Sequence, residues 1–258
     1  MHAPTVVVSR WPGETAWPDG SSSAPDLEGV DPARARELED QLASALCARG
    51  SDVLVIPHVY YLSSDHPATE RLRDLQGNLI VASWLSPRAS EWVLRALGVG
   101  HGGRNISCVG LRGAGSADEV VDECLRLLGS SQSDPEGGPG RIEELADAAT
   151  PRWYPVLDYS LCQGCGQCMD FCLFGVFTTE NERVCATSPD NCKPGCPACA
   201  RVCPHGAIMF PHYADDPAIA GALDAEARAS AGSPDGGERA DVDSDLDDLI
   251  SALEQLDD

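Results

Sequence analysis

Short apolar runs alternate with amphipathic stretches over the first half of the chain. The apolar runs that predict strands cover residues 5–10, 52–57, 78–84 and 105–112. Stretches with helical spacing lie between them, at residues 32–47, 68–75, directly after Ser86-Pro87, and at 117–129. Because strands alternate with helices, this pattern predicts a parallel sheet that helices cover on both faces.

The pattern divides the chain into five parts. Residues 1–129 are expected to form a flavodoxin-like three-layer α/β domain, and residues 130–150 a linker with one short acidic helix. Residues 151–213 form a separate cysteine-rich domain. Residues 214–243 contain too few large apolar side chains to fold alone, and we expect a disordered acidic linker there.

Residues 244–258 break this acidic pattern with one apolar stripe. The stripe has helical spacing and consists of Leu246, Leu249, Ile250, Leu253 and Leu256. Ser244 and Asp247 are placed as in a capping box at its start. A helix this short is marginal in water, so we expect it to order only in a groove. The groove belongs either to the N-terminal domain of the same chain or to a partner protein.

Eight cysteines of the cysteine-rich domain fall into two matched sets. Residues 162–172 read CQGCGQCMDFC, with the spacing C-x2-C-x2-C-x3-C, and residues 192–204 read CKPGCPACARVCP. Gly175 and Gly206 each lie three residues after the last cysteine of their set, and apolar residues follow both. A structural zinc site needs only four ligands, whereas the first spacing is the one found around paired iron–sulfur clusters.

Over roughly residues 153–213 the chain therefore resembles the bacterial two-[4Fe–4S] ferredoxins. The resemblance implies a small α+β ferredoxin-like domain with two [4Fe–4S] clusters and no catalytic side chain. It assigns one cluster to Cys162, Cys165, Cys168 and Cys203. It assigns the other cluster to Cys192, Cys196, Cys199 and Cys172.

Two positions depart from the pattern of that family. Leu173 stands where the family usually has proline, and three residues instead of two separate Cys192 from Cys196. The longer loop changes how backbone amides point at the cluster sulfurs, and such hydrogen bonds influence the reduction potential. We expect two clusters of unequal potential, with a three-iron cluster at the second site as the alternative.

The remaining cysteines and the histidines suggest no further metal site. Cys47, Cys108 and Cys124 lie in apolar patterns and are expected to be small core residues. Cys185 is either a strand residue packed near a cluster or an exchangeable ligand or redox thiol. His205 and His212 are expected to flank the second cluster, where they tune it, lie on a docking surface or, as is usual for surface histidines, do neither.

Several aromatic and basic residues follow the predicted strands directly. They are Arg10 and Trp11, His58 to Tyr60, Trp84 with Ser86, and Arg112 with Gly113. Ligands of parallel α/β sheets bind at the carboxyl ends of the strands, so these residues predict either a pocket or docking face, or simple packing of the loops.

The net charge of −23 is concentrated in the flanks of the cysteine-rich domain. Residues 151–213 hold 5 acidic and 4 basic side chains, whereas residues 214–258 hold 14 acidic and 2 basic ones. Such a chain is repelled by nucleic acid and anionic membranes and is attracted to basic protein surfaces. The N-terminus has no signal-like segment, the apolar runs are too short for a membrane span, and thiols stay reduced in the cytoplasm, where we expect the protein.

Three functions fit these observations. The first is an electron-transfer protein, in which two clusters serve a partner oxidoreductase and the flanking parts select that partner. The second is an oxidoreductase whose N-terminal domain binds a small molecule or cofactor that the clusters serve. The third is a redox-responsive assembly protein, whose terminal helix recruits a target. No arrangement of catalytic side chains is apparent, so a carrier without its own substrate is favoured over an enzyme.

Overall fold

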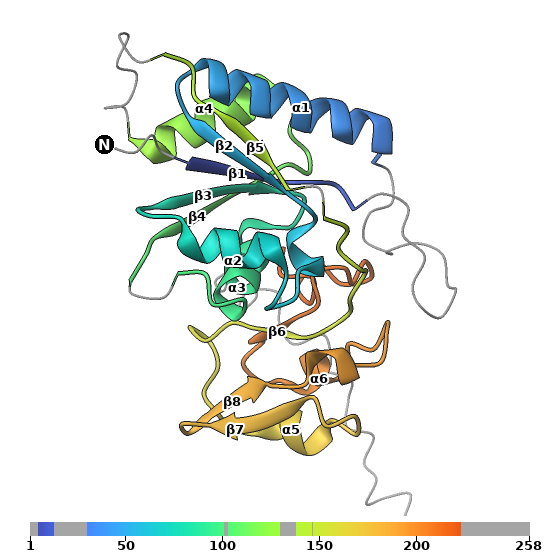
Figure 1. Ribbon diagram of the computed structural model, residues 1–258. Coiled ribbons are helices and arrows are strands. Elements are labelled where there is room, and N and C mark those ends of the chain that lie inside the picture. The colour runs from blue at the N-terminus through green and yellow to red at the C-terminus, as the bar shows by residue number, and fades with distance from the viewer. Residues whose placement is uncertain (1–4, 13–29, 101–102, 130–137, 146, 223–258) are drawn as a thin grey trace, which may run out of the picture. The chain divides into compact units, whose positions relative to one another are not determined.

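The computed structural model describes residues 5–12, 30–100, 103–129, 138–145 and 147–222 (Figure 1). All of these described residues belong to one compact unit. The predicted terminal helix at 244–258 and most of the predicted acidic linker lie outside the described residues. None of the helices within the described ranges combines the length and hydrophobicity that a membrane crossing requires.

Five parallel strands form the central sheet. They are β1 (Thr5–Ser9), β2 (Asp52–Ile56), β3 (Leu79–Ser83), β4 (Ile106–Gly110) and β5 (Ile142–Glu144). Their order is β4-β3-β1-β2-β5, and every pairing is parallel, which confirms the predicted parallel sheet. The first four strands follow the flavodoxin-like order, but β5 lies beside β2, whereas a flavodoxin-like fifth strand lies beside β4.

Four helices follow the strands at the predicted places. They are α1 (Pro32–Ala48), α2 (Pro67–Asp74), α3 (Pro87–Ala96) and α4 (Ala117–Leu128). The side chains of Asp31, Ser86 and Ser116 each accept a hydrogen bond from a backbone N–H in the first turn of their helix. Proline at the first position of α1, α2 and α3 needs no backbone donor there, which is why these starts could be located in advance.

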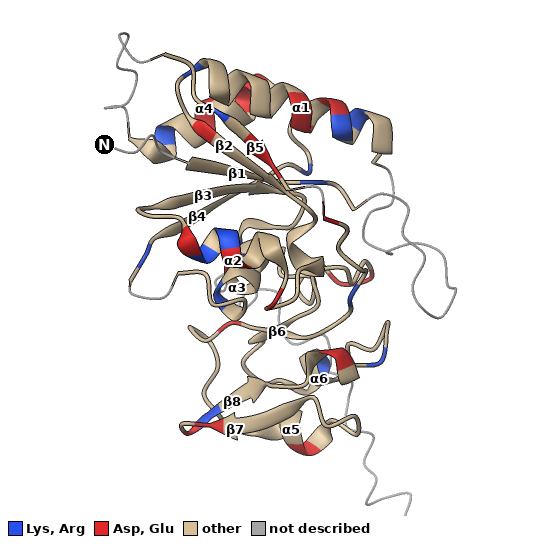
Figure 2. Ribbon diagram, viewed as in Figure 1, with Lys and Arg blue, Asp and Glu red and all other residues tan. Residues whose placement is uncertain are grey.

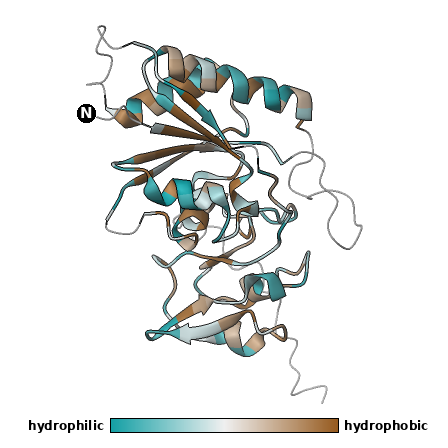
Figure 3. Cartoon of the chain, in the orientation of Figure 1, coloured by the Kyte–Doolittle hydropathy of each residue, from teal (hydrophilic) through white to brown (hydrophobic). Residues whose placement is uncertain are grey.

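The helices form two layers, one on each face of the sheet. The core on the side of α1 and α4 includes Val6, Val8, Leu42, Leu46, Val120 and Cys124. The core on the side of α2 and α3 includes Val7, Leu54, Leu72, Val81, Val93 and Leu94. Alternate residues of β1 thus fill opposite cores, and Figure 3 shows this central strand as largely hydrophobic. Figure 2 shows charged residues on α1, α2, α4 and β5, whereas β1 and β3 carry none.

The short acidic helix predicted within residues 130–150 is absent from the described part of that segment, which holds strand β5 instead. The N–H of Val53 donates to the carbonyl of Arg141 over 2.8 Å, and the Asp52 carboxylate accepts from the N–H of Arg141 over 2.9 Å. The segment therefore pairs with the open edge of β2 through backbone hydrogen bonds. Because β5 is an exposed edge strand, with Ile142 46% exposed, it carries no apolar pattern that could have predicted it.

The approach to β5 depends on a glycine. A Cβ atom at Gly140 would lie 2.0 Å from the carbonyl oxygen of Ser51, whereas a Cβ atom at Gly138 would meet nothing within 4 Å. We expect Gly140→Ala to lower the free energy of unfolding by about 1–3 kcal/mol, because a backbone atom cannot move aside as a side chain can. Gly138→Ala is the matched control and should have little effect. Urea unfolding of both variants tests this, and equal stabilities would contradict it.

The cysteine-rich domain contains little regular structure. Strands β6 (Val156–Leu157) and β9 (Ile208–Met209) pair in antiparallel fashion, as do β7 (Phe177–Glu180) and β8 (Arg183–Ala186). Two five-residue helices, α5 (Gln167–Phe171) and α6 (Ala198–Val202), complete it. Its core combines Trp153, Leu157, Val176, Phe177, Ile208 and Phe210 with cysteines of both sets.

Residues 214–222 were expected to be part of a disordered linker, and this expectation is wrong. The Asp216 carboxylate accepts from the N–H of Ala218 over 2.8 Å, and the N–H of Phe210 donates to the carbonyl of Ile219 over 2.8 Å. Ile219 and Ala220 are buried. A local aspartate turn thus orders this segment and lets two apolar side chains join the domain core.

The two domains share a buried interface. The Tyr60 ring stacks on that of Tyr154 at 4.4 Å. The Tyr60 hydroxyl donates to the Tyr154 carbonyl over 2.5 Å and accepts from the Tyr154 N–H over 2.9 Å. Tyr154, Val156 and Met209 all belong to the core beneath α2 and α3. The cysteine-rich domain is therefore packed against the α/β domain, and part of its apolar surface belongs to a joint core.

A buried histidine pair joins the same two domains. His58 Nε2 lies 2.9 Å from His212 Nε2, and His58 Nδ1 lies 3.2 Å from the carbonyl of Arg10. The carbonyl can only accept, so His58 Nδ1 carries its proton and His58 Nε2 accepts from His212. His212 Nδ1 is then left to accept from the Tyr61 hydroxyl, 3.4 Å away. One neutral tautomer of each ring satisfies all three contacts.

The histidine pair predicts a loss of stability in acid. Burial lowers the pKa of His58 to about 4, and burial together with His58 and Arg112 lowers the pKa of His212. An unfolded chain binds these protons near the ordinary pKa of about 6.5, so the folded state loses stability as pH falls from there towards 4. We expect His58 alone to contribute about 3 kcal/mol to this loss.

The measurement compares urea unfolding of the cluster-loaded protein at several pH values with that of a variant carrying His58→Gln and His212→Gln. The wild type should lose more stability between pH 6.5 and pH 4 than the variant. Parallel pH profiles would rule out the buried neutral pair.

The other residues at the carboxyl ends of the strands also pack against one another. Trp11 and Trp84 are buried edge to face at 5.0 Å. The buried Glu39 carboxylate accepts from the Trp84 indole N–H over 2.7 Å and from the backbone N–H of Trp11, and it forms an ion pair with Arg10. Of the two alternatives for these residues, the described contacts favour packing over a ligand pocket.

Candidate iron–sulfur site

Two cavities in the cysteine-rich domain divide the eight cysteines between them. The first cavity is lined by Cys162, Cys165, Cys168 and Cys203, together with His205 and apolar residues. The second cavity is lined by Cys172, Cys192, Cys196 and Cys199, together with Asp170 and apolar residues. Each cavity thus collects three thiols of one set and the last thiol of the other set.

The exchange of the last cysteines follows from the local fold. Helices α5 and α6 pack against each other and place Cys168 and Cys199 in the shared core. Each helix ends after five residues at a cysteine in extended conformation, with φ −78° and ψ 106° at Cys172 and φ −75° and ψ 109° at Cys203. The similar backbone conformations at these two helix ends place the last thiol of each set in the cavity of the other set.

Glycines complete the two-fold repeat. Gly175 and Gly206 both adopt left-handed φ values, of 65° and 56°. The residues that follow them, Val176 in one half and Ala207 in the other, are buried to a similar extent. An L-residue with a Cβ would be strained at either turn, so the repeat seen in the sequence is a repeat of backbone geometry.

The electrostatic surroundings of the thiols show the same grouping. Burial, together with the neighbouring Cys203 and Cys162, raises the pKa of Cys168 to about 11. Burial raises the pKa of Cys192 to about 12, with Cys196 and Cys172 as its neighbours. Without a positive group these thiols stay protonated at neutral pH, whereas metal ligation requires thiolates. Both cavities therefore fit a buried cationic iron group.

The spacing of the thiols suits a cluster better than a single ion. No three cysteine, histidine or carboxylate side chains among the described residues converge closely enough to hold one metal ion. The four cysteines of a [4Fe–4S] cluster bind four different irons, so they stand farther apart than the ligands of a zinc ion.

The two cavities differ in their surroundings. The N–H of Ala207 donates to Cys203 Sγ over 3.4 Å beside the first cavity. The second cavity has an exposed apolar rim, where Phe171 is 51% exposed, Leu173 93% and Phe174 43%. Leu173 is one of the two departures from the family pattern, and its side chain points into solvent instead of closing the cavity.

The remaining cysteines lie outside both cavities. Cys124 is a buried residue of α4, and Cys47 and Cys108 pack against the sheet cores, as predicted. Cys185 lies in β8, where its sulfur accepts from the Tyr159 hydroxyl over 3.6 Å. It lines neither cavity, so the described contacts favour a strand residue packed near the first set.

The prediction for the two histidines needs correction. His205 lines the first cavity, because it follows Cys203, which crosses to that side. His212 is buried against His58 at the domain interface and lies on no docking surface. Sequence reasoning missed this pairing because 154 residues separate the two histidines, and no local pattern links them.

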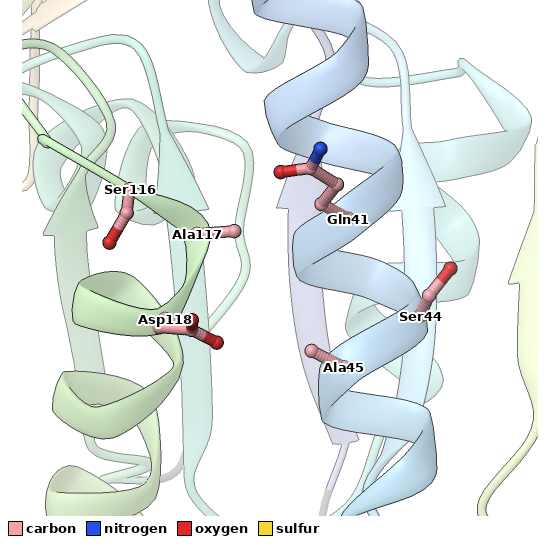
Figure 4. A pocket seen from close by; sticks show the side chains of 6 residues that line it. All are labelled: Gln41, Ser44, Ala45, Ser116, Ala117 and Asp118. Atoms are coloured by element: carbon pink, nitrogen blue, oxygen red, sulfur yellow. The ribbon is translucent and has the colours of Figure 1, made fainter.

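A further hollow lies between α1 and the start of α4 (Figure 4). It is lined by Gln41, Ser44, Ala45, Ser116, Ala117 and Asp118. No cysteine reaches it, and Ser116 is already engaged in capping α4. The cavities that carry redox-capable side chains are therefore the two in the cysteine-rich domain.

Comparison with known proteins identifies relatives of one segment of the chain. No family model matches the chain. The uncharacterized ferredoxin MJ0251 of Methanocaldococcus jannaschii is 42% identical over 60 residues, which is 23% of this chain and 41% of that protein. The uncharacterized ferredoxin MJ0199 of the same organism is 43% identical over 54 residues, which is 20% of this chain and 86% of that protein.

The match to MJ0199 covers nearly all of that protein, so the chain belongs to the ferredoxin family over this segment. The segment is accordingly that of an iron–sulfur protein. The chain spans about two fifths of the length of MJ0251, and neither match extends over most of this chain.

Proposed function

We propose that this protein carries single electrons on two [4Fe–4S] clusters, to or from a partner oxidoreductase. The observation that supports this most is the division of eight thiols between two cavities, four in each. The first cluster is assigned to Cys162, Cys165, Cys168 and Cys203. The second cluster is assigned to Cys172, Cys192, Cys196 and Cys199.

The protein's own residues bind and shield the clusters. An iron–sulfur cluster, when bound, supplies a reversible one-electron couple. Trp153, Phe177 and Ile208 exclude water from the core between the cavities. Cys168 of the first set and Cys199 of the second lie in the same core, so two bound clusters would be neighbours suited to exchanging electrons.

The two clusters should have different reduction potentials. The second cavity opens at an exposed apolar rim, and the enlarged loop between Cys192 and Cys196 surrounds it with a different set of backbone amides. Hydrogen bonding and solvent exposure both shift cluster potentials, so the asymmetry of the cavities favours unequal couples.

Partner docking is proposed for the parts that flank the clusters. The α/β domain and the leucine stripe of residues 244–258 would select the partner, and the net charge favours a basic docking surface. A pull-down with the full chain and with a chain lacking residues 244–258 tests this. Partners retained equally by both chains would argue against the stripe.

Protein-film voltammetry after anaerobic reconstitution tests the proposed activity. Two reversible one-electron waves are expected from the full chain. A single wave, or waves that disappear after one cycle, would mean that the protein does not carry electrons on two clusters.

A further inference from the structure

Helix α3 of the α/β domain presents an arginine to the cysteine-rich domain. Arg88 Nε donates to the Asp158 carboxylate over 2.7 Å, and the two side chains are only 15% and 3% exposed. Arg88 Nη2 also lies 3.5 Å from the carbonyl of Gly206. One turn further along α3, the Trp92 ring packs edge-on against that of Tyr159 at 5.9 Å.

Both partners of Arg88 are hydrogen-bonded to the backbone of cysteines that line the first cavity. The N–H of Gly206 donates to the carbonyl of Cys203 over 3.2 Å. The backbone carbonyl of Asp158 accepts from the N–H of Cys162 over 3.0 Å. The N–H of Asp158 donates to the carbonyl of Ala207 over 2.7 Å, and the N–H of Ala207 donates to Cys203 Sγ. The Arg88–Asp158 ion pair therefore lies a few bonds from two of the four proposed ligands of the first cluster.

This contact breaks the symmetry of the repeat. Gly175 is the position related to Gly206 beside the second set, and no arginine among the described residues donates to its carbonyl. Arg88 Nη1 is buried and has no hydrogen-bond partner among the described residues. A buried ion pair is weak evidence for stability, since its desolvation offsets most of its attraction. Its placement beside only one thiol set suggests an electrostatic role.

We propose that Arg88 and Asp158 are positioning residues that set the reduction potential of the first cluster. The proposal rests on the proposed function. Reduction adds one electron to the cluster and neither forms nor breaks a bond. The Arg88 cation favours that added negative charge and the Asp158 carboxylate disfavours it, both at low dielectric. The α/β domain would thus control the chemistry of the cluster domain through α3.

Spectroelectrochemical titration of the full-length reconstituted protein tests this with three variants. Arg88→Met should make the first cluster harder to reduce, and Asp158→Asn should make it easier. Each change should alter the reduction equilibrium constant by about tenfold, which is about 59 mV for one electron. The double variant should return towards the wild-type value. The second cluster in the same molecule should be affected much less.

Two control variants separate charge from packing. Arg88→Lys keeps the cation but loses the planar geometry, so the potential should stay near that of the wild type. Arg126→Met removes a cation from the exposed end of α4, 67% exposed, and should change neither potential. Shifts of the same sign in Arg88→Met and Asp158→Asn, or no shift in either, would overturn the proposal.

Failure of the proposed electron-carrier function would give a different experimental result from failure of the Arg88–Asp158 proposal. If the wild type assembles fewer than two clusters, the electron-carrier proposal fails before any variant is measured. If the wild type shows two couples and the variants shift neither, only the role of Arg88 and Asp158 is wrong. Far-UV circular dichroism and iron content of each variant show whether it has folded and loaded.

Discussion

Cys203→Ala is expected to remove the cluster of the upstream set, Cys162 to Cys168, although Cys203 belongs to the downstream motif. The end of α6 directs Cys203 into the first cavity, where it completes a group of four thiols. The second cavity keeps its four cysteines, so its cluster should survive. About half of the iron should be lost, and the EPR signal that remains should be that of the second cluster.

Cys172→Ala is the mirror variant and should have the opposite result, with the second cluster lost and the first retained. Cys185→Ala is the matched control, because its thiol lies in the same domain but lines neither cavity. It should retain both clusters. Loss of the downstream cluster in Cys203→Ala would show that each motif holds its own cluster and would refute the exchange.

Removal of both clusters is expected to unfold most of the cysteine-rich domain and to leave the α/β sheet intact. The four strands of this domain are two to four residues long, and its two α-helices are five residues long. Cysteines form a substantial part of its core. So small a core rarely sustains a fold without metal or disulfide support. The core between the sheet and α1 and α4 contains no residue of that domain.

Hydrogen exchange with and without clusters measures this directly. Amides of residues 153–213 should exchange far faster after anaerobic chelation of the iron, whereas those of β1 and β3 should stay protected. Segment 214–222 is informative because, apart from its own aspartate turn, it is held by contacts with the domain core and with Ser86. Unchanged protection across residues 153–222 would show that the polypeptide holds the cavities open without iron.

The sheet and its four helices could be predicted because they depend on local, repeated signals. Alternate valines of β1 fill two cores, and serine or aspartate caps with proline starts mark the helices. Strand β5 could not be predicted, because backbone pairing with the edge of β2 places it and its side chains stay exposed. The turn at Asp216 could not be predicted either, because only two apolar residues of this segment join the domain core.

The spacing of the cysteines predicted the two sets, but it did not predict which residues of the α/β domain contact the cysteine-rich domain. Cysteine spacing and the repeated glycines predicted the two sets, because both reflect local backbone geometry. The contacts of Tyr60, His58 and Arg88 with the cysteine-rich domain join residues 70 to 154 positions apart. Such pairs leave no local pattern, so the joint core of the two domains emerged only from the structure.

Because the two domains share a core, packing holds them together in addition to the chain that links them. Tyr60, His58 and Arg88 each use a different contact to fix the cysteine-rich domain to the α/β domain. The Arg88 contact lies beside the first thiol set through Asp158, and the second set borders the exposed rim at Leu173. One cluster would thus be controlled by the protein itself, and the other would be accessible to a partner.

Iron content and Mössbauer spectroscopy of the full-length protein, reconstituted anaerobically, test the presence of two clusters most directly. Two [4Fe–4S] clusters require about eight irons per chain, with all spectral area in cubane components. About four irons per chain, or a spectrum of isolated thiolate-bound iron, would contradict the two-cluster assignment of the eight cysteines.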